Sequence, residues 1–267
     1  MNILEKIVAD KKKEVEKRKQ ETPVLELEDY DYFETECDSL KRNLLLPDKT
    51  GIIAEFKRKS PSKGIINDKA EIFDVIDAYD MIGASGISIL TDEKYFGGTL
   101  EDIYDYRDAI GTPILRKDFM IDEYQFYEAK AIGADVILLI AACLTVQQTK
   151  QFAALAKQLG LEVLLEIHNE EELEHICDEV DFVGVNNRNL KTFEVDINTS
   201  LNLINKIPKD KLAIAESGIS NVDTITTLKR AGFKGFLIGE NFMKQADPSI
   251  AFAEFVKTLQ TSLKGGL

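Results

Sequence analysis

The chain has 267 residues, of which 44% are hydrophobic and 30% are charged, so it can bury one large core or two small ones. Its formal net charge is −14, which argues against nucleic acid and anionic membranes as partners because both require a basic face. Three widely spaced cysteines and two histidines suggest neither a disulfide framework nor a metal site. No apolar run reaches about 18 residues and the N-terminus has no apolar signal core, so we expect a cytoplasmic protein.

The first 50 residues differ in pattern from the rest of the chain. Residues 2–20 show helical periodicity with Leu4, Ile7, Val8 and Val15 on one face, and the pattern alone is typical of a surface helix. Residues 21–50 contain two prolines and many acids, which favours an irregular connection with one short helix. We therefore assign residues 1–50 to an N-terminal helical extension and residues 51–267 to the main domain.

A regular alternation of strands and helices begins at residue 51. Short β-branched runs occur at 52–56, 86–90, 113–116, 135–141, 161–167, 181–185, 212–215 and 235–239. Helical patterns lie at 69–82, 99–109, 122–132, 145–159, 169–176, 199–206, 221–231 and 249–263, with Asp122, Thr145, Asn169 and Asn221 as expected N-caps. Continuous apolar runs indicate parallel strands that are buried on both faces. Eight such units predict an α/β fold, a (β/α)8 TIM barrel. The first strand is not followed by a GxGxxG motif, which argues against a dinucleotide-binding sheet.

Polar side chains follow most of the predicted strands. In this fold the active site lies at the carboxyl ends of the strands. These ends carry Glu55 and Lys57, then Lys117, Glu166, Asn186 with Arg188, Glu216 with Ser217, and Glu240. For any one of these residues, exposure of the strand end to water explains its polarity as well as a role in a site does. Exposure to water is a weaker explanation for all six strand ends together. A basic cluster within an acidic protein indicates an anionic substrate.

The last two strand ends carry glycines that suit a phosphate. Gly218 and Gly239 allow backbone N–H groups to approach a ligand closely, and loops at these positions form the recurrent phosphate site of the fold. Phe96 and Phe119 lie in neighbouring loops and can supply apolar walls. Together these features predict a phosphorylated sugar joined to an aromatic ring. His168, beside an expected N-cap, is interpreted as a structural residue.

Seven motifs in order resemble the indole-3-glycerol phosphate synthase family of tryptophan biosynthesis. They occupy residues 53–62, 88–92 with 95–98, 115–119, 165–168, 184–190, 215–219 and 236–240. The resemblance implies a lyase that closes a ring in 1-(2-carboxyphenylamino)-1-deoxyribulose 5-phosphate and yields indole-3-glycerol phosphate, carbon dioxide and water. It also implies that no metal or cofactor is needed and that the N-terminal extension packs over the barrel mouth. We expect the protein to be a monomer whose partner is its small-molecule substrate. Glu240 stands where some members have serine, which a backbone contact tolerates.

The resemblance assigns roles residue by residue. Lys117 is the expected general acid at the ketone, while Glu166 and Glu55 share the remaining acid–base work. Lys57 is expected to hold the substrate carboxylate, and Asn186 and Ser217 complete the catalytic group. The substrate and its phosphate are expected to contact the remaining site residues: Ser60, Phe96, Phe119, Arg188, Glu216, Gly218, Gly239 and Glu240.

Two alternatives stay open at this point. Another phosphate-binding barrel enzyme, such as phosphoribosylanthranilate isomerase, needs an early cysteine–aspartate pair, whereas the first strand here offers Glu55 and Lys57. A non-catalytic barrel that only binds a metabolite or a partner is disfavoured by the complete set of Glu55, Lys57, Lys117 and Glu166.

Overall fold

Eight parallel strands form a closed barrel in the computed structural model, which describes residues 2–190 and 192–265. The barrel strands are β1 (Ile52–Phe56), β4 (Gly86–Leu90), β5 (Ile114–Lys117), β6 (Val136–Ile140), β7 (Glu162–Ile167), β8 (Phe182–Asn186), β9 (Leu212–Glu216) and β10 (Gly235–Ile238). Each strand pairs with its neighbour along the chain, and β1 pairs with both β4 and β10. Each predicted strand is present within a residue or two at its ends, so the predicted (β/α)8 fold is confirmed.

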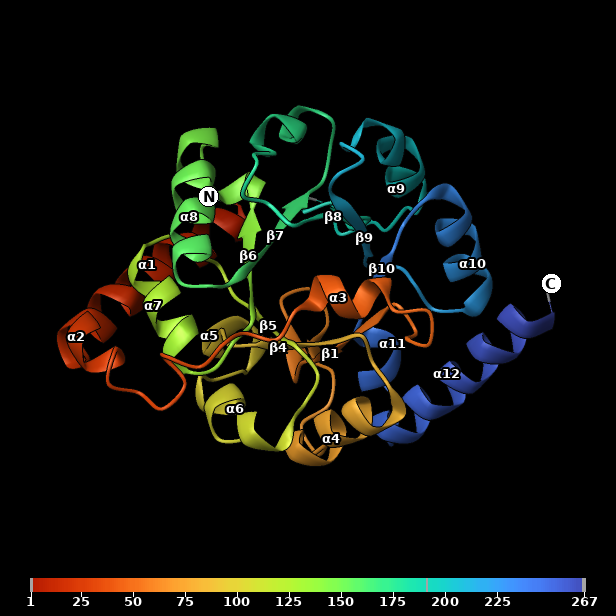
Figure 1. Cartoon of the computed structure of the whole chain (residues 1–267), viewed down its shortest axis with the longest axis horizontal. Coiled ribbons are helices and arrows are strands. Elements are labelled where there is room, and N and C mark those ends of the chain that lie inside the picture. Colours follow the sequence, from red (N-terminus) through yellow and green to blue (C-terminus); the bar gives the residue numbers. More distant parts are fainter. Residues whose placement is uncertain (1, 191, 266–267) are drawn as a thin grey trace.

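Helices surround the barrel on its outer face (Figure 1). The α-helices after β1 are α4 (Ile72–Ile82), α5 (Glu93–Phe96), α6 (Glu101–Tyr104), α7 (Tyr124–Ala131), α8 (Val146–Gln158), α9 (Asn198–Leu203), α10 (Val222–Ala231), α11 (Glu240–Met243) and α12 (Pro248–Gly265). The 3₁₀ helices are η1 (Arg107–Ala109), η2 (Ala141–Cys143), η3 (Glu171–His175) and η4 (Ile204–Lys206). In the described part of the chain, no helix has both the length and the apolar character needed to cross a membrane.

The helix starts follow the predicted capping residues in part. Thr145 and Asn221 are the N-caps of α8 and α10, and their side chains accept backbone N–H groups three residues further on. Asp122 and Asn169 also accept backbone N–H groups, but the caps of α7 and η3 lie one residue later. The segment predicted as a helix at 169–176 is the 3₁₀ helix η3. Its sequence is dominated by acids and offers the core little apolar surface, so a longer α-helix gains nothing by packing there.

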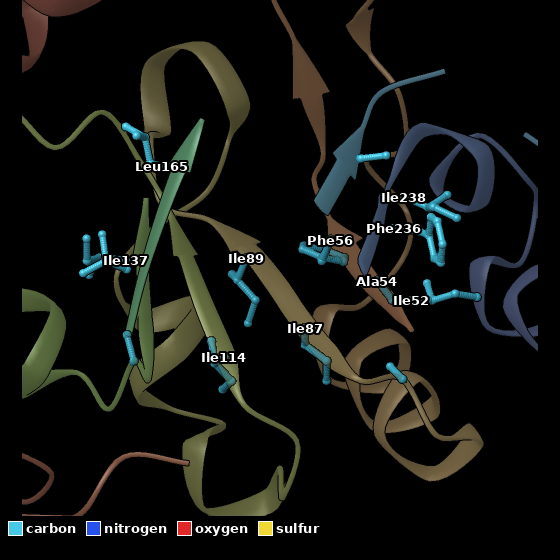
Figure 2. Packing of buried hydrophobic residues seen from close by; sticks show 14 of the residues in the cluster. Ile52, Ala54, Phe56, Ile87, Ile89, Ile114, Ile137, Leu165, Phe236 and Ile238 are labelled. Carbon is cyan, nitrogen blue, oxygen red and sulfur yellow. The ribbon is translucent and has the colours of Figure 1, made fainter. Parts of the chain in front are cut away.

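Side chains of the barrel strands alternate between two separate apolar layers. Ile52, Ala54 and Phe56 of β1 belong to the outer layer, between the strands and the helices (Figure 2). Ile53 belongs to the inner layer, which fills the barrel. Because successive side chains on a strand point to opposite faces, Glu55 continues the inner row of Ile53. By the same alternation, the side chains of Lys117 on β5, Glu166 on β7 and Glu216 on β9 point to the inside of the barrel.

The N-terminal segment contributes to the barrel interior. It forms α1 (Ile3–Glu21), α2 (Val24–Leu27) and α3 (Leu40–Leu45), so the prediction of a connection with one short helix was wrong. Leu40 and Leu44 of α3 are buried in the inner layer. A Cβ added to Gly86, the first residue of β4, would lie 2.7 Å from Leu40 Cδ1, which places α3 against the amino end of the barrel. The barrel core therefore includes side chains from before residue 50.

Candidate active site

One cavity of about 490 Å³ lies at the carboxyl ends of the barrel strands. The site residues singled out from the sequence all line it: Glu55, Lys57, Ser60, Phe96, Lys117, Phe119, Glu166, Asn186, Arg188, Glu216, Ser217, Gly218, Gly239 and Glu240. Its size suits a small-molecule ligand. Leu138 and Leu237 of the inner layer form part of the wall, and Ile3, Leu4 and Ile7 of α1 form another part. The sequence did not identify Lys63, which also lines the cavity.

Lys117 is a cation that lines the cavity and contacts two acids. Its Nζ donates to Glu166 Oε2 and to Glu216 Oε2, each at 3.0 Å. Lys117 and Glu216 end β5 and β9, and Glu166 is the penultimate residue of β7, so three strands converge on one ammonium group. Burial by itself lowers the pKa of Lys117, but Glu166, Glu216 and Glu55 together raise it above its ordinary value. Lys117 is therefore a charged proton donor that faces the cavity.

The two acids that share Lys117 differ in their surroundings. Burial favours the neutral form of Glu166, but Lys117 and His168 hold its pKa well below the ordinary value. Asn186 Nδ2 also donates to Glu166 Oε1 at 3.2 Å. Burial raises the pKa of Glu216 despite Lys117, and its Oε1 finds no hydrogen-bond partner among the described residues. The site thus holds one firmly ionised acid beside one acid that can keep a proton near neutral pH.

A second pair, Glu55 and Lys57, lies at the end of β1. Lys57 Nζ donates to Glu55 Oε1 at 2.6 Å, as the two-residue spacing on a strand predicts. Gly239 provides the space for this acid, because a Cβ there would lie 2.4 Å from Glu55 Oε1 and 2.9 Å from Glu55 Cβ. Gly184 has the same function for Glu216, whose Oε1 would lie 2.1 Å from an added Cβ. The sequence predicted Gly239 as a phosphate contact, but it did not indicate that Gly239 also leaves space for the Glu55 side chain.

Backbone strain marks the rim after β9, and two basic side chains lie near Glu240, which follows β10. Ser217 has a φ of 64°, which is uncommon for a residue with a Cβ, and Gly218 follows with a φ of 76°. Arg188 lies 3.4 Å from Glu240 Oε2, and Lys63 lies 3.8 Å from Glu240 Oε1. Two cations and a strained turn therefore meet where an anionic group of a ligand can be held. Within residues 2–190 and 192–265, no three His, Cys, Asp or Glu side chains are grouped to hold a metal ion.

A buried ion network links α1 to the loops that flank the cavity. Lys11 of α1 is 1% exposed, and its Nζ lies 3.0 Å from Asp92 and 2.9 Å from Asp118. Asp118 follows Lys117 directly and also pairs with Arg116 at 3.2 Å. Asp92 is the N-cap of α5, the helix that ends at Phe96. The sequence did not identify Lys11, because a lysine on a helix is expected on its solvent side.

The comparison with protein families agrees with this geometry. The family model described as indole-3-glycerol phosphate synthase matches residues 4–255. The chain belongs to the indole-3-glycerol phosphate synthase family. The resemblance inferred from the seven motifs is thereby confirmed.

Relatives in this family match nearly the whole chain. An indole-3-glycerol phosphate synthase of Bacteroides thetaiotaomicron is 48% identical over 259 residues, which cover 97% of this chain and 99% of the relative. One from Caldanaerobacter subterraneus subsp. tengcongensis is 44% identical over 263 residues, with coverage of 97% and 99%. Among solved structures, a mutant tryptophan synthase alpha-subunit from Pyrococcus furiosus aligns with a TM-score of 0.60. It is 19% identical and covers 80% of this chain and 98% of its own, so this likeness supports the fold alone.

Proposed function

We propose that this chain, as an indole-3-glycerol phosphate synthase, catalyses the closure of 1-(2-carboxyphenylamino)-1-deoxyribulose 5-phosphate to indole-3-glycerol phosphate, carbon dioxide and water in tryptophan biosynthesis. The observation that carries the proposal is the Lys117 ammonium, which lies between Glu166 and Glu216 in the cavity at the carboxyl ends of the strands. Ring closure needs an acid at the ketone oxygen and a base for the later dehydration, and both lie here within hydrogen-bond distance of each other.

In the proposed mechanism Lys117 donates to the ketone oxygen while the arene carbon that bears the carboxylate attacks the carbonyl carbon. Lys57 holds the carboxylate until it leaves as carbon dioxide and the ring regains its aromaticity. The new hydroxyl then leaves as water, and Glu166 and Glu55 share the proton transfers of this step. Asn186, Ser217 and Glu216 position the hydroxyl groups of the substrate. Phe96 and Phe119, whose ring centroids are 6.1 Å apart, form the wall for the arene.

We also propose that α1 forms a wall of the site, so that the N-terminal extension belongs to the catalytic unit. Ile3, Leu4 and Ile7 line the cavity, and exclusion of water by such a wall strengthens the interaction of charges inside it. Cytoplasmic location and a monomeric state remain predictions. Sedimentation equilibrium of the purified chain tests the monomer: a mass near 30.0 kDa supports it, and a mass of twice that value contradicts it.

A direct assay tests the proposed function. Purified protein is mixed with the synthetic substrate, and the indole product is followed by its fluorescence. Turnover to indole-3-glycerol phosphate with release of one carbon dioxide is expected. Turnover of phosphoribosylanthranilate instead would indicate an isomerase, and binding of phosphorylated sugars without turnover would indicate a metabolite-binding barrel.

The phosphate group of the substrate is expected at the turn formed by Ser217 and Gly218 and at Gly239 with Glu240. Arg188 and Ser60 lie on the same cavity, so basic and polar groups surround the position. A crystal soaked in sulfate is expected to show the anion there, held mainly by backbone N–H groups. Sulfate bound elsewhere on the rim, with this position empty, would contradict the assignment.

Gly239→Ala is expected to lower kcat by about 10²-fold, because the added methyl displaces the Glu55 carboxylate from Lys57. Gly111→Ala is the matched control, since its added Cβ would come no closer than 4.0 Å to another atom. Steady-state kinetics and thermal melting are measured on both variants. Equal activity of the two variants would show that the position of Glu55 does not matter for the reaction.

A further inference from the structure

His168 contacts Glu166 but does not line the cavity. It follows β7, two residues after Glu166, so both side chains leave the chain on the same side. Its Nε2 lies 3.2 Å from Glu166 Oε1, and its Nδ1 lies 3.2 Å from Glu172 Oε2. The side chain is 9% exposed. The sequence favoured a purely structural role, whereas these contacts place the ring against a proposed acid–base group.

The two carboxylates beside the ring favour its doubly protonated form. A neutral imidazole carries one N–H group and can donate to only one of the two carboxylates. The second acid is firmly anchored: Glu172 Oε2 also accepts the backbone N–H of His168 at 2.7 Å, and Glu172 Oε1 accepts from Asn169 Nδ2 at 2.9 Å. Nδ1 is hydrogen-bonded to Glu172, whereas Nε2 lies at ion-pair distance from Glu166 without hydrogen-bond geometry. An imidazolium is the form of the ring that both carboxylates attract.

We propose that the His168 imidazolium is a positioning residue, which keeps Glu166 ionised and orients its carboxylate toward Lys117. The inference rests on the proposed function, because it concerns the acid–base work of Glu166. Lys117 contacts Glu166 Oε2, while His168 and Asn186 face Oε1. A substrate ketone that draws the Lys117 ammonium away leaves Glu166 with His168 as its neighbouring cation. Glu166 then stays a carboxylate that can accept a proton in the dehydration step.

The charges around the ring support the protonated state. Glu166 of β7 and Glu172 of η3 face it directly, and Lys117 of β5 lies beyond Glu166. The thiol of Cys143 in η2 is neutral, because burial, Glu166 and Glu172 raise its pKa to about 12. Burial lowers the pKa of His168, but hydrogen bonding and charge attraction from the two acids raise it to about 10. The ring is thus expected to lose its proton only in alkaline solution.

Nitrogen-15 NMR of the histidine rings tests the protonation state without any substrate. The chain has two histidines, and His175 is an internal control because its Nδ1 contacts Thr149 Oγ1 at 2.8 Å and burial lowers its pKa. At pH 7.5 one ring is expected to be doubly protonated and the other neutral, and the protonated signals are expected to vanish in His168→Gln. A neutral His168 ring at pH 7.5 would overturn the proposal, whether or not the protein closes the indole ring.

The pH dependence of kcat tests the effect on Glu166. Loss of a neighbouring cation raises the pKa of a carboxylate, so the acid limb of the profile is expected about one unit higher in His168→Gln, with about a tenfold lower kcat and little change in KM. His168→Lys is expected to restore part of the loss, and His175→Gln to leave the acid limb in place. An unshifted acid limb in His168→Gln would overturn the proposal.

Glu172→Gln provides a second variant, which retains the histidine and covers the case in which His168→Gln does not fold. It removes one of the two anions that stabilise the imidazolium, so the ring is expected to titrate at lower pH and the alkaline limb of kcat to move in the same direction. An NMR titration of His168 that does not change in Glu172→Gln would also count against the proposal.

Discussion

Lys117→Ala is expected to lower kcat for ring closure by about 10²–10⁴-fold, which is the typical contribution of a placed general acid. The variant removes the ammonium that lies 3.0 Å from both Glu166 and Glu216, and among residues 2–190 and 192–265 no other strand end presents a cation between these two acids. Kinetics are measured by product fluorescence, with Lys229→Ala as a control on an exposed lysine of α10. A variant that keeps more than about a tenth of the wild-type kcat would exclude Lys117 as the acid.

The same variant has an expected signature in stability. Lys117 helps to hold the pKa of Glu166 below its ordinary value, so the ion pair stabilises the fold above the pKa that a glutamate has in the unfolded chain, and this stabilisation is lost as the pH falls. In the variant, burial without Lys117 favours the neutral forms of both acids, so they can take up protons at pH 5 but not at pH 8. Removal of Lys117 is therefore expected to cost more free energy of unfolding at pH 8 than at pH 5. Urea denaturation at the two pH values measures the difference. A loss that is larger at pH 5 would contradict this reading of the ion pair.

Lys11→Met is expected to lower the free energy of unfolding by about 3–5 kcal/mol, the usual cost of removing one partner from a buried ion pair. The lysine is buried between Asp92 and Asp118, and the variant leaves both carboxylates in the interior. Burial raises the pKa of Asp118, but Lys11 and Arg116 hold it far below its ordinary value, so this acid is charged at neutral pH. In the variant Asp118 keeps Arg116 as a partner, and Asp92 loses its buried cation.

Lys11→Met is also expected to reduce activity, because Asp92 caps the helix that carries Phe96 and Asp118 follows Lys117. Lys12→Met is the matched control, since Lys12 is exposed on the same helix. Urea denaturation and steady-state kinetics are measured on both variants. If Lys11→Met is as stable and as active as Lys12→Met, the ion network is dispensable and α1 is only a cover.

The strands and the main site could be predicted from the sequence for one physical reason. Parallel strands buried on both faces are continuous apolar runs, and their period of two fixes which polar residue at the carboxyl end points inward. Glu55, Lys117 and Glu166 follow directly from that rule. The short helices were less predictable. Leu40 and Leu44 of α3 pack into the barrel interior, which local periodicity does not show, and the acidic sequence of η3 offers the core little apolar surface.

Buried charges were the residues that the sequence could not identify. Lys11 lies four residues from both Ile7 and Val15, so the spacing places it on the buried face, but a lysine there is stable only if acids from distant loops meet it. Asp92 and Asp118 supply those acids from two different loops, and no local pattern shows that they converge. His168 was interpreted as a structural residue for the same reason, because its contacts depend on Glu172 one turn later and on the direction of the Glu166 carboxylate.

Closure of the barrel ties the beginning of the chain to its end. Ile52 of β1 pairs with Phe236 of β10, and Leu44 of α3 packs near Gly235. During synthesis the first strand and helix α3 leave the ribosome long before their partners are made. Contacts between such distant residues form slowly, because the chain must lose loop entropy before it gains them. The nascent protein therefore carries exposed apolar strands until β10 emerges, and this unfinished barrel is the species that most needs protection from aggregation.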